Sequence, residues 1–222
     1  IDFEENSHEM AKCTDIDFVI KSPGISDDLE IIDFYRNNGI KVISEIEFAF
    51  NFSKSKIIGI TGSNGKTTTT TLVHKLISDA NISCSISGNI GNSFSKVCED
   101  SVQYSTVELS SFQLDGVEKF RPHIAILTGI SPDHLDRYKN YNAYIEAKFK
   151  ITKNQSEYDY LINNSDCDKT NKYIKIKNIN SILLLFSIKK KVDQGAYYLN
   201  KEINIIIDKN KITMPTDKFL VK

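Results

Sequence analysis

The sequence is poor in several residue types that mark particular protein classes. It has no tryptophan, four prolines and two methionines in 222 residues, and it has no run of about 18 apolar residues that would span a membrane. A formal net charge of −1 argues against a broad basic surface for nucleic acid or anionic lipid. With 40% hydrophobic residues the chain can still bury a core. We expect a globular protein of one large or two modest domains, with no nucleic-acid or membrane partner.

Cysteine is also scarce, and its four copies are scattered. Cys13, Cys84, Cys98 and Cys167 form no C-x-x-C pair, which argues against a structural zinc site and against a disulfide framework. Reduced cysteines are typical of the cytoplasm. No secretory signal is visible at the start of the sequence, so we expect a cytoplasmic protein.

Apolar patterns predict an α/β protein with a boundary in the polar stretch 51–56. Before it, the order of elements indicates parallel strands, with strands at 17–20 and 40–43 and helices at 28–38 and 45–52. After it, the patterns predict further strands, two long helices and a terminal hairpin. The strands are expected at 57–60, 84–87, 104–109, 124–127, 158–162 and 182–186, the helices at 67–80 and 141–153, and the hairpin within 196–214.

The strongest local signal is a glycine-rich loop between a strand and a helix. It reads Thr61-Gly62-Ser63-Asn64-Gly65-Lys66-Thr67-Thr68. Glycines let backbone N–H groups converge on phosphate oxygens, and the helix N-terminus favours an anion. Lys66 would reach the β- and γ-phosphates, and the Thr67 hydroxyl would bind Mg²⁺. The loop departs from the general pattern because Ile60 stands where the first glycine belongs, so a turn that binds nothing is the alternative.

Two further candidates follow strands. Glu108 ends the strand at 104–109, on the edge where open parallel sheets bind ligands, and is a candidate Mg²⁺ ligand; a solvated glutamate is the alternative. His134 follows Ser131-Pro132-Asp133, which looks like a helix start with serine as its cap. A capping or surface histidine is the alternative there.

Lys148 is placed unusually on its helix. At 100° per residue, it falls in the middle of the apolar stripe formed by Tyr141, Tyr144, Ile145 and Ile151. Such a lysine either extends its ammonium to solvent or has a function. Burial would lower its pKa and favour the neutral amine, which can add CO₂ to form a carbamate, an oxygen ligand for Mg²⁺.

Taken together, these residues resemble the Mur ligases, the ATP-dependent amide-forming enzymes of peptidoglycan synthesis. Several motifs in order carry the resemblance, which extends from Ser22 to Lys148: Ser22-Pro-Gly-Ile25, 61–68, Gly88-Asn-Ile-Gly91, Glu108-Leu-Ser-Ser-Phe-Gln-Leu114, Ser131-Pro-Asp-His-Leu-Asp-Arg-Tyr138 and Tyr144-Ile-Glu-Ala-Lys148. The segment 108–114 is most similar to the members that add D-glutamate to UDP-N-acetylmuramoyl-L-alanine. From about residue 154 onward, only length and the hairpin pattern are similar.

The resemblance implies a fold. Residues 54–222 would form the central ATP-binding domain, with a P-loop-type, mostly parallel sheet and flanking helices. Residues 1–53 would be the C-terminal part of a Rossmann-like, uridine-nucleotide-binding domain.

The resemblance also implies roles for the site residues. The loop from Gly62 to Thr68, with Lys66, would hold ATP. Thr67 and Glu108 would hold one Mg²⁺, and His134 and a carbamylated Lys148 a second. Asn89 and Ser110 would face the nucleotide substrate, and Ser22, Pro23 and Gly24 its diphosphate. The substrate carboxylate would form an acyl phosphate that D-glutamate attacks, in a monomeric enzyme.

Some features depart from the family pattern. Gly129 stands where relatives often carry asparagine. The opening uridine-binding strand and the amino-acid-binding domain have no counterpart in the sequence, so we expect this chain to be a piece of a longer enzyme. The alternatives are an ATP-binding module without ligase activity, and a related Mur or folylpolyglutamate-type ligase with another acceptor.

Overall fold

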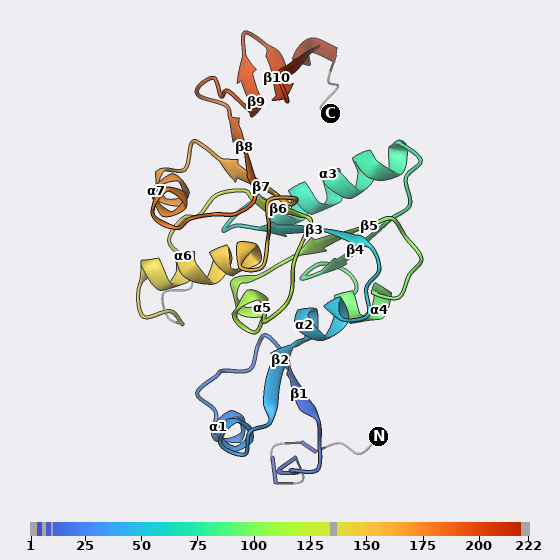
Figure 1. The fold of residues 1–222 in the computed structure, drawn as a ribbon, viewed down its shortest axis with the longest axis vertical. Helices are drawn as coiled ribbons and strands as arrows, with labels where there is room; N and C mark the ends of the chain where they lie inside the picture. Colours follow the sequence, from blue (N-terminus) through green and yellow to red (C-terminus); the bar gives the residue numbers. More distant parts are fainter. Residues whose placement is uncertain (1–3, 6–7, 10, 134–136, 219–222) are drawn as a thin grey trace.

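The computed structural model describes residues 4–5, 8–9, 11–133 and 137–218 and shows an α/β protein with two sheets (Figure 1). The first, smaller unit contains a parallel pair, β1 (Phe18–Lys21) and β2 (Lys41–Ser44), joined through helix α1 (Glu30–Asn37). Its core is a small cluster of Ile31, Ile32, Tyr35 and Ile40. The strand–helix–strand order predicted from the apolar pattern is confirmed.

The second sheet has nine strands in the order β11-β10-β9-β8-β7-β6-β3-β5-β4. Neighbours from β4 to β9 pair parallel, and β9, β10 and β11 pair antiparallel. The predicted α/β class with an antiparallel appendage is therefore confirmed. The strands are β3 (Lys56–Thr61), β4 (Cys84–Gly88), β5 (Tyr104–Glu108), β6 (Ile124–Leu127), β7 (Tyr160–Asn164), β8 (Ile182–Ser187), β9 (Gly195–Leu199), β10 (Glu202–Ile207) and β11 (Asn210–Pro215).

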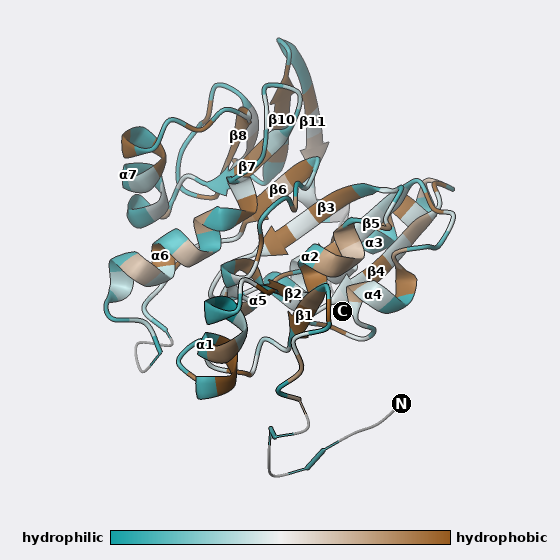
Figure 2. Ribbon diagram, turned by 60° about the horizontal axis from the view of Figure 1, so that its bottom comes forward, coloured by the Kyte–Doolittle hydropathy of each residue, from teal (hydrophilic) through white to brown (hydrophobic). Residues whose placement is uncertain are grey.

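Helices cover both faces of this sheet (Figures 1 and 2). Helix α3 (Lys66–Asp79) packs Val73 and Ile77 against Ile58, Ile60 and Ile126 on one face. The opposite face carries the main core, a cluster of eighteen buried residues that includes Leu109, Phe120 and Tyr144. The other helices are α2 (Glu45–Phe50), α4 (Phe94–Val97), α5 (Ser111–Asp115), α6 (Tyr141–Phe149) and α7 (Asp168–Ile176).

Several local predictions differ from the structure. Helix α6 ends at Phe149 and continues as a 3₁₀ turn, Lys150–Thr152, and the terminal stretch forms three strands rather than one hairpin. The expected helix start at Ser131-Pro132 is wrong, because neither 131–133 nor 137–140 is helical. Helix α6 begins later, where the Asn140 side chain accepts a hydrogen bond from the Ala143 N–H. All four cysteines are free thiols, as predicted.

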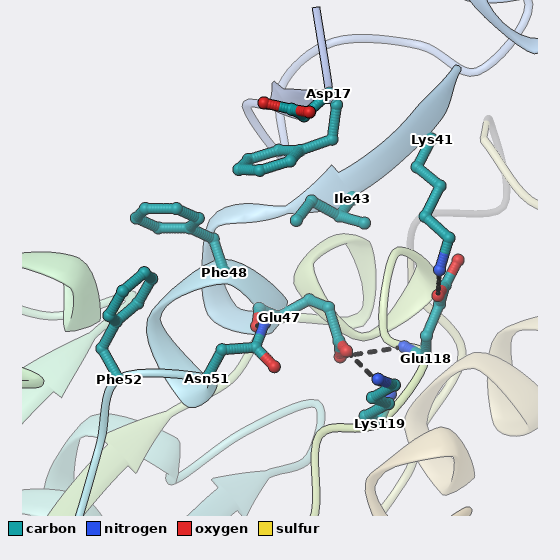
Figure 3. Close-up of a pocket in the computed structure, with 10 residues that line it drawn as sticks. Asp17, Lys41, Ile43, Glu47, Phe48, Asn51, Phe52, Glu118 and Lys119 are labelled. Carbon is teal, nitrogen blue, oxygen red and sulfur yellow. Dashed lines mark hydrogen bonds and ion pairs between the residues drawn. The ribbon is translucent and has the colours of Figure 1, made fainter.

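Helix α2 connects the two units and is anchored by a buried carboxylate. Glu47 is only 3% exposed, and its two oxygens accept the backbone N–H groups of residues 118, 119 and 120 at 2.8–2.9 Å. Figure 3 shows the bonds to residues 118 and 119 beside a cavity of about 310 Å³ that Phe18, Ile43 and Phe48 line. At the rim of the cavity, Lys41 forms an ion pair with Glu118 at 2.9 Å. The first unit is thereby tied to the loop after α5.

Candidate functional site

The glycine-rich loop connects β3 to α3 at the carboxyl edge of the large sheet. Gly62 has a φ of +153°, and a Cβ there would lie 1.9 Å from the Thr128 hydroxyl, so no side chain fits. The loop folds around its own lysine, because the Lys66 ammonium donates to the carbonyls of Gly62 (3.0 Å) and Ser63 (3.1 Å). Asn64, Gly65, Thr67 and Thr68 lie exposed at the outer rim of the loop and at the first turn of α3.

The segment after β6 holds this loop in place, which the sequence analysis missed. Thr128 donates to the Asn64 carbonyl at 2.7 Å, and the Ser63 N–H donates to the Gly129 carbonyl at 2.9 Å. The Ser63 hydroxyl donates to the Ser131 carbonyl at 2.9 Å and accepts the Ser131 N–H at 3.0 Å. The loop conformation is therefore specified from outside as well as by its own glycines.

Gly129 itself has a backbone conformation that favours glycine. Its φ is +140°, and a Cβ at this position would have the Asn164 amide nitrogen as its nearest neighbour, at 3.6 Å. Backbone conformation rather than lack of space therefore selects glycine here.

Glu108 and Thr67, which the sequence analysis paired, lie together beside the loop, and Asn89, which it placed facing the nucleotide substrate, joins them. The Glu108 carboxylate, only 2% exposed, accepts the Thr67 hydroxyl at 2.8 Å and the Asn89 amide at 3.1 Å. The carboxylate and the hydroxyl are hard oxygen donors, a set that suits Mg²⁺ completed by water and substrate phosphates. Within the described ranges, no cluster of three or more histidine, cysteine or acidic side chains could bind a metal by itself.

Lys148 is buried, so of the two alternatives left open by its place on the apolar stripe, the extension of its ammonium to solvent is not what the structure shows. Its side chain is 2% exposed, and the Nζ donates to the Gly62 carbonyl at 2.9 Å. Burial, reinforced by the nearby Lys66 charge and opposed by Asp133, lowers the pKa of Lys148 to about 7. A substantial fraction of the amine is therefore neutral at neutral pH, which an ordinary lysine is not.

Tyr144 supports both the loop and Lys148, and the sequence analysis gave it no role. Its hydroxyl lies 3.1 Å from the Ser63 hydroxyl, and its ring centroid is 4.7 Å from the Lys148 Nζ. Burial raises the pKa of Tyr144. The available signal was its position four residues before Lys148, on the same face of α6.

The remaining predicted residues lie around this centre. Ser110 caps α5, where its hydroxyl accepts the Gln113 N–H at 3.2 Å and the Gln113 side chain accepts the Ser110 N–H at 2.9 Å. The turn Ser22–Ile25, closed by an Ile25 N–H bond to the Ser22 carbonyl at 3.0 Å, faces α5. A polar cavity of about 460 Å³ lies there, lined in part by Lys21, Phe112 and Arg137. His134 lies outside the described residues.

Comparison with known proteins gives a family match and curated relatives that all point to the Mur ligases. Residues 60–217 match the family described as Mur ligase middle domain. The chain is 48% identical to the UDP-N-acetylmuramoylalanine–D-glutamate ligase of Christiangramia forsetii, covering 100% of this chain and 50% of that protein. It is 42% identical to the enzyme of the same name from Bacteroides fragilis, covering 92% of this chain and 47% of that protein. The chain thus spans about half the length of the curated relatives it matches.

Solved structures share the fold at lower sequence identity. The MurF ligase of Thermotoga maritima in complex with ADP has a TM-score of 0.55 and 16% identity, covering 90% of this chain and 56% of that one. The UDP-N-acetylmuramate:L-alanyl-gamma-D-glutamyl-meso-diaminopimelate ligase from Neisseria meningitides has a TM-score of 0.60 and 14% identity, covering 88% and 66%. Within the described residues, we find no helix with the length and apolarity to cross a membrane.

Proposed function

Because this chain belongs to the Mur ligase family, we propose that its full-length protein is an ATP-dependent ligase that joins D-glutamate to UDP-N-acetylmuramoyl-L-alanine in cytoplasmic peptidoglycan synthesis. The acceptor and the amino acid are inferred from the relatives' names and from the segment 108–114. The observation that carries the chemistry is the placement of Glu108 and Thr67 at the phosphate loop, close to the buried amine of Lys148.

Within this proposal, the two units have separate tasks. Residues 54–222 are the central ATP-binding domain, and residues 1–53 belong to the domain that holds the uridine nucleotide. The Ser22–Gly24 turn would contact the diphosphate of the acceptor. Asn89 and Ser110 would face the acceptor, while each also supports a neighbour, Glu108 or helix α5.

The protein groups would act mainly by positioning and by charge. The loop N–H groups and Lys66 hold the phosphates of ATP. The acceptor carboxylate attacks the γ-phosphate, the bond to ADP breaks, and an acyl phosphate forms. The amine of D-glutamate then attacks the acyl carbon and displaces phosphate. Bound at Thr67 and Glu108, and at His134 and Lys148, Mg²⁺ would neutralise phosphate charge so that the carboxylate can approach.

The proposed form of Lys148 is a carbamate. With a pKa near 7, the amine is partly neutral and can add CO₂, losing one proton, to give a carboxylate-like oxygen donor. Bicarbonate labelled with ¹³C should therefore give a carbamate carbon signal in wild-type protein and none in Lys148→Ala. Lys148→Ala should also lose most activity, partly restored by short-chain carboxylates. Full activity in that variant would contradict a metal-bridging carbamate.

Phosphate release by the full-length enzyme tests the function as a whole. Release from ATP should require UDP-N-acetylmuramoyl-L-alanine, D-glutamate and Mg²⁺ together. Release that ignores both substrates would contradict the ligase and identify an ATP-binding module. Release that depends on a different acceptor would identify a related ligase.

A further inference from the structure

Arg137 joins the two units of the molecule at the turn Ser22–Ile25. Its guanidinium donates to three successive carbonyl oxygens: Nη2 to Pro23 (3.2 Å) and to Ile25 (3.0 Å), and Nη1 to Gly24 (3.5 Å). The arginine lies in the segment between β6 and α6, whereas the turn belongs to the first unit. One side chain from the central domain therefore holds the backbone of this turn at three consecutive residues.

An aromatic stack fixes the guanidinium from behind. Its central carbon lies 4.2 Å from the centroid of the Phe112 ring, and Phe112 stacks on Tyr138 with centroids 5.9 Å apart at 12°. The Tyr138 hydroxyl donates to Asp115 at 2.6 Å. Since Phe112 is the second residue of α5 and follows Glu108 by four positions, the same segment that carries Glu108 also fixes Arg137.

The contact orients the peptide groups of the turn, with carbonyl oxygens toward Arg137 and N–H groups away from it. The C=O and N–H of a planar peptide point in opposite directions, so the N–H groups of Gly24 and Ser26 point away from Arg137. Lys21, itself 9% exposed, is a second cation on the carbonyl side: its ammonium donates to the Ile25 carbonyl at 3.0 Å and also pairs with Asp27 at 3.0 Å. Oriented N–H groups with cations behind them favour an anion in front of the turn.

We propose that Arg137 is a positioning residue that sets the affinity for the diphosphate of the nucleotide acceptor, by locking the Ser22–Ile25 turn at a fixed place relative to Glu108. This inference rests on the proposed function, in which that turn contacts the acceptor diphosphate. Lysine cannot replace the arginine, because a single ammonium neither spans three carbonyls nor stacks on a ring.

Steady-state kinetics of the full-length enzyme test the proposal. Arg137→Lys and Arg137→Ala should raise the KM for UDP-N-acetylmuramoyl-L-alanine by about tenfold or more, since lysine keeps at most one of the three charge-assisted hydrogen bonds and alanine keeps none. The KM for ATP and the kcat at saturating acceptor should stay within about twofold, because the phosphate loop is not touched. Arg121→Lys is the matched control, since Arg121 pairs with Asp159, outside the site, and should leave the acceptor KM unchanged.

Two outcomes would overturn the inference. The first is an unchanged acceptor KM in Arg137→Lys; the second is an equal rise of the KM for acceptor and for ATP, which indicates general damage to the fold. If wild-type enzyme shows no acceptor-dependent turnover, the proposed function fails by itself. Calorimetry with UDP then tests the inference separately, and Arg137→Lys should bind UDP more weakly than wild type. Equal affinity of the two proteins, or no binding of UDP to wild type, would contradict the inference.

Discussion

At the scale of single residues, Lys148 is a basic side chain in surroundings that disfavour its charged form. A buried ammonium has lost its water, lies near the Lys66 charge and donates to a neutral carbonyl, so its charged form is disfavoured. The fold places this unfavourable burial of an amine directly beside the glycine-rich loop. Such a cost at a candidate site is typical of residues kept for chemistry rather than for stability.

This conflict predicts a pH-dependent stability. Above a pKa of about 7 the folded state loses the Lys148 proton, while the unfolded state keeps it to about 10.5. The unfolded state thus binds more protons in that window, and the free energy of unfolding rises with pH across it. In CO₂-free buffer, Lys148→Met should melt roughly 2–5 °C above wild type at pH 6, and the difference should shrink by pH 9.

The control for this measurement is Lys172→Met, which replaces an exposed lysine on α7. It should leave the pH profile of the melting temperature parallel to that of wild type. A Lys148→Met difference that stays constant from pH 6 to pH 9 would contradict a lowered pKa of Lys148.

Glu108 supports a second prediction. Glutamine keeps the size of the side chain but removes the charge and one of the two acceptors for Thr67 and Asn89. Glu108→Gln should lower the kcat of the full-length enzyme on the order of 100-fold and shift its Mg²⁺ titration to higher concentration. Glu99→Gln, an exposed change, is the control. Wild-type activity at the same Mg²⁺ concentration would rule out Glu108 as a ligand.

The features found from sequence depend on patterns within a few positions, whereas the contacts that were missed join segments far apart in the sequence. Lys148 was singled out because its helix supplies the apolar stripe within a few positions. The hydrogen bond from Arg137 to the Pro23 carbonyl joins residues 114 positions apart, and the bond from Thr128 to the Asn64 carbonyl joins residues 64 positions apart. Local periodicity contains no information on such contacts, which the tertiary arrangement of the two sheets creates.

At the scale of elements, helix α2 holds the two units together through polar contacts. The Glu47 carboxylate satisfies three backbone N–H groups that would otherwise be buried without a partner. Next to it, the Ser44 N–H donates to the Gly116 carbonyl at 3.2 Å. A short helix of six residues is therefore fixed by polar contacts at its first turn, not by its length.

Glu47→Gln should consequently destabilise the chain by about 3 kcal/mol, because an amide group turns a donor toward a backbone donor. The free energy of unfolding from urea titration measures this. Glu30→Gln changes a glutamate whose side chain is 92% exposed and should stay within about 0.5 kcal/mol of wild type. Equal effects of the two substitutions would show that the Glu47 contacts contribute little.

The elements that sequence reasoning missed are the short ones. Helices α4 and α5 have four and five residues, too few to show a helical period. Helix α5 had a readable start in the Ser110-x-x-Gln113 capping box, which indicates a helix N-terminus. Helix α7 is nine residues long but buries only Thr170 completely, so its apolar stripe is weak. The strands were predicted because their apolar patterns are continuous, and α3 because the glycine-rich loop opens it.

At the scale of the whole molecule, the two units differ in the size of their cores. The first unit buries a cluster of four residues under a two-stranded sheet, whereas the large sheet buries a cluster of eighteen. Isolated two-stranded sheets are marginally stable in water. Within the 222 residues of this sequence, the first unit therefore depends on its attachment through Glu47, Lys41 and Arg137.

Hydrogen exchange of the 222-residue chain should reveal this difference. Backbone amides of β1 and β2 should exchange at least about tenfold faster than those of β3 and β5, since local opening needs less free energy there. In Glu47→Gln the gap should widen, with β3 and β5 affected least. Equal protection in both sheets would instead show a single cooperative unit.

The strand order also determines when the phosphate loop can acquire its shape. Strand β3 lies between β5 and β6, with Lys56 beside Tyr104 and Ile58 beside Ile124. Contacts across such separations form slowly, because a long loop must close first. A chain still on the ribosome and ending near residue 120 has the loop sequence but lacks Thr128, Gly129 and Ser131, which hold it. The nucleotide binding proposed for this loop is therefore expected only after β6 and the segment that follows it have been synthesised.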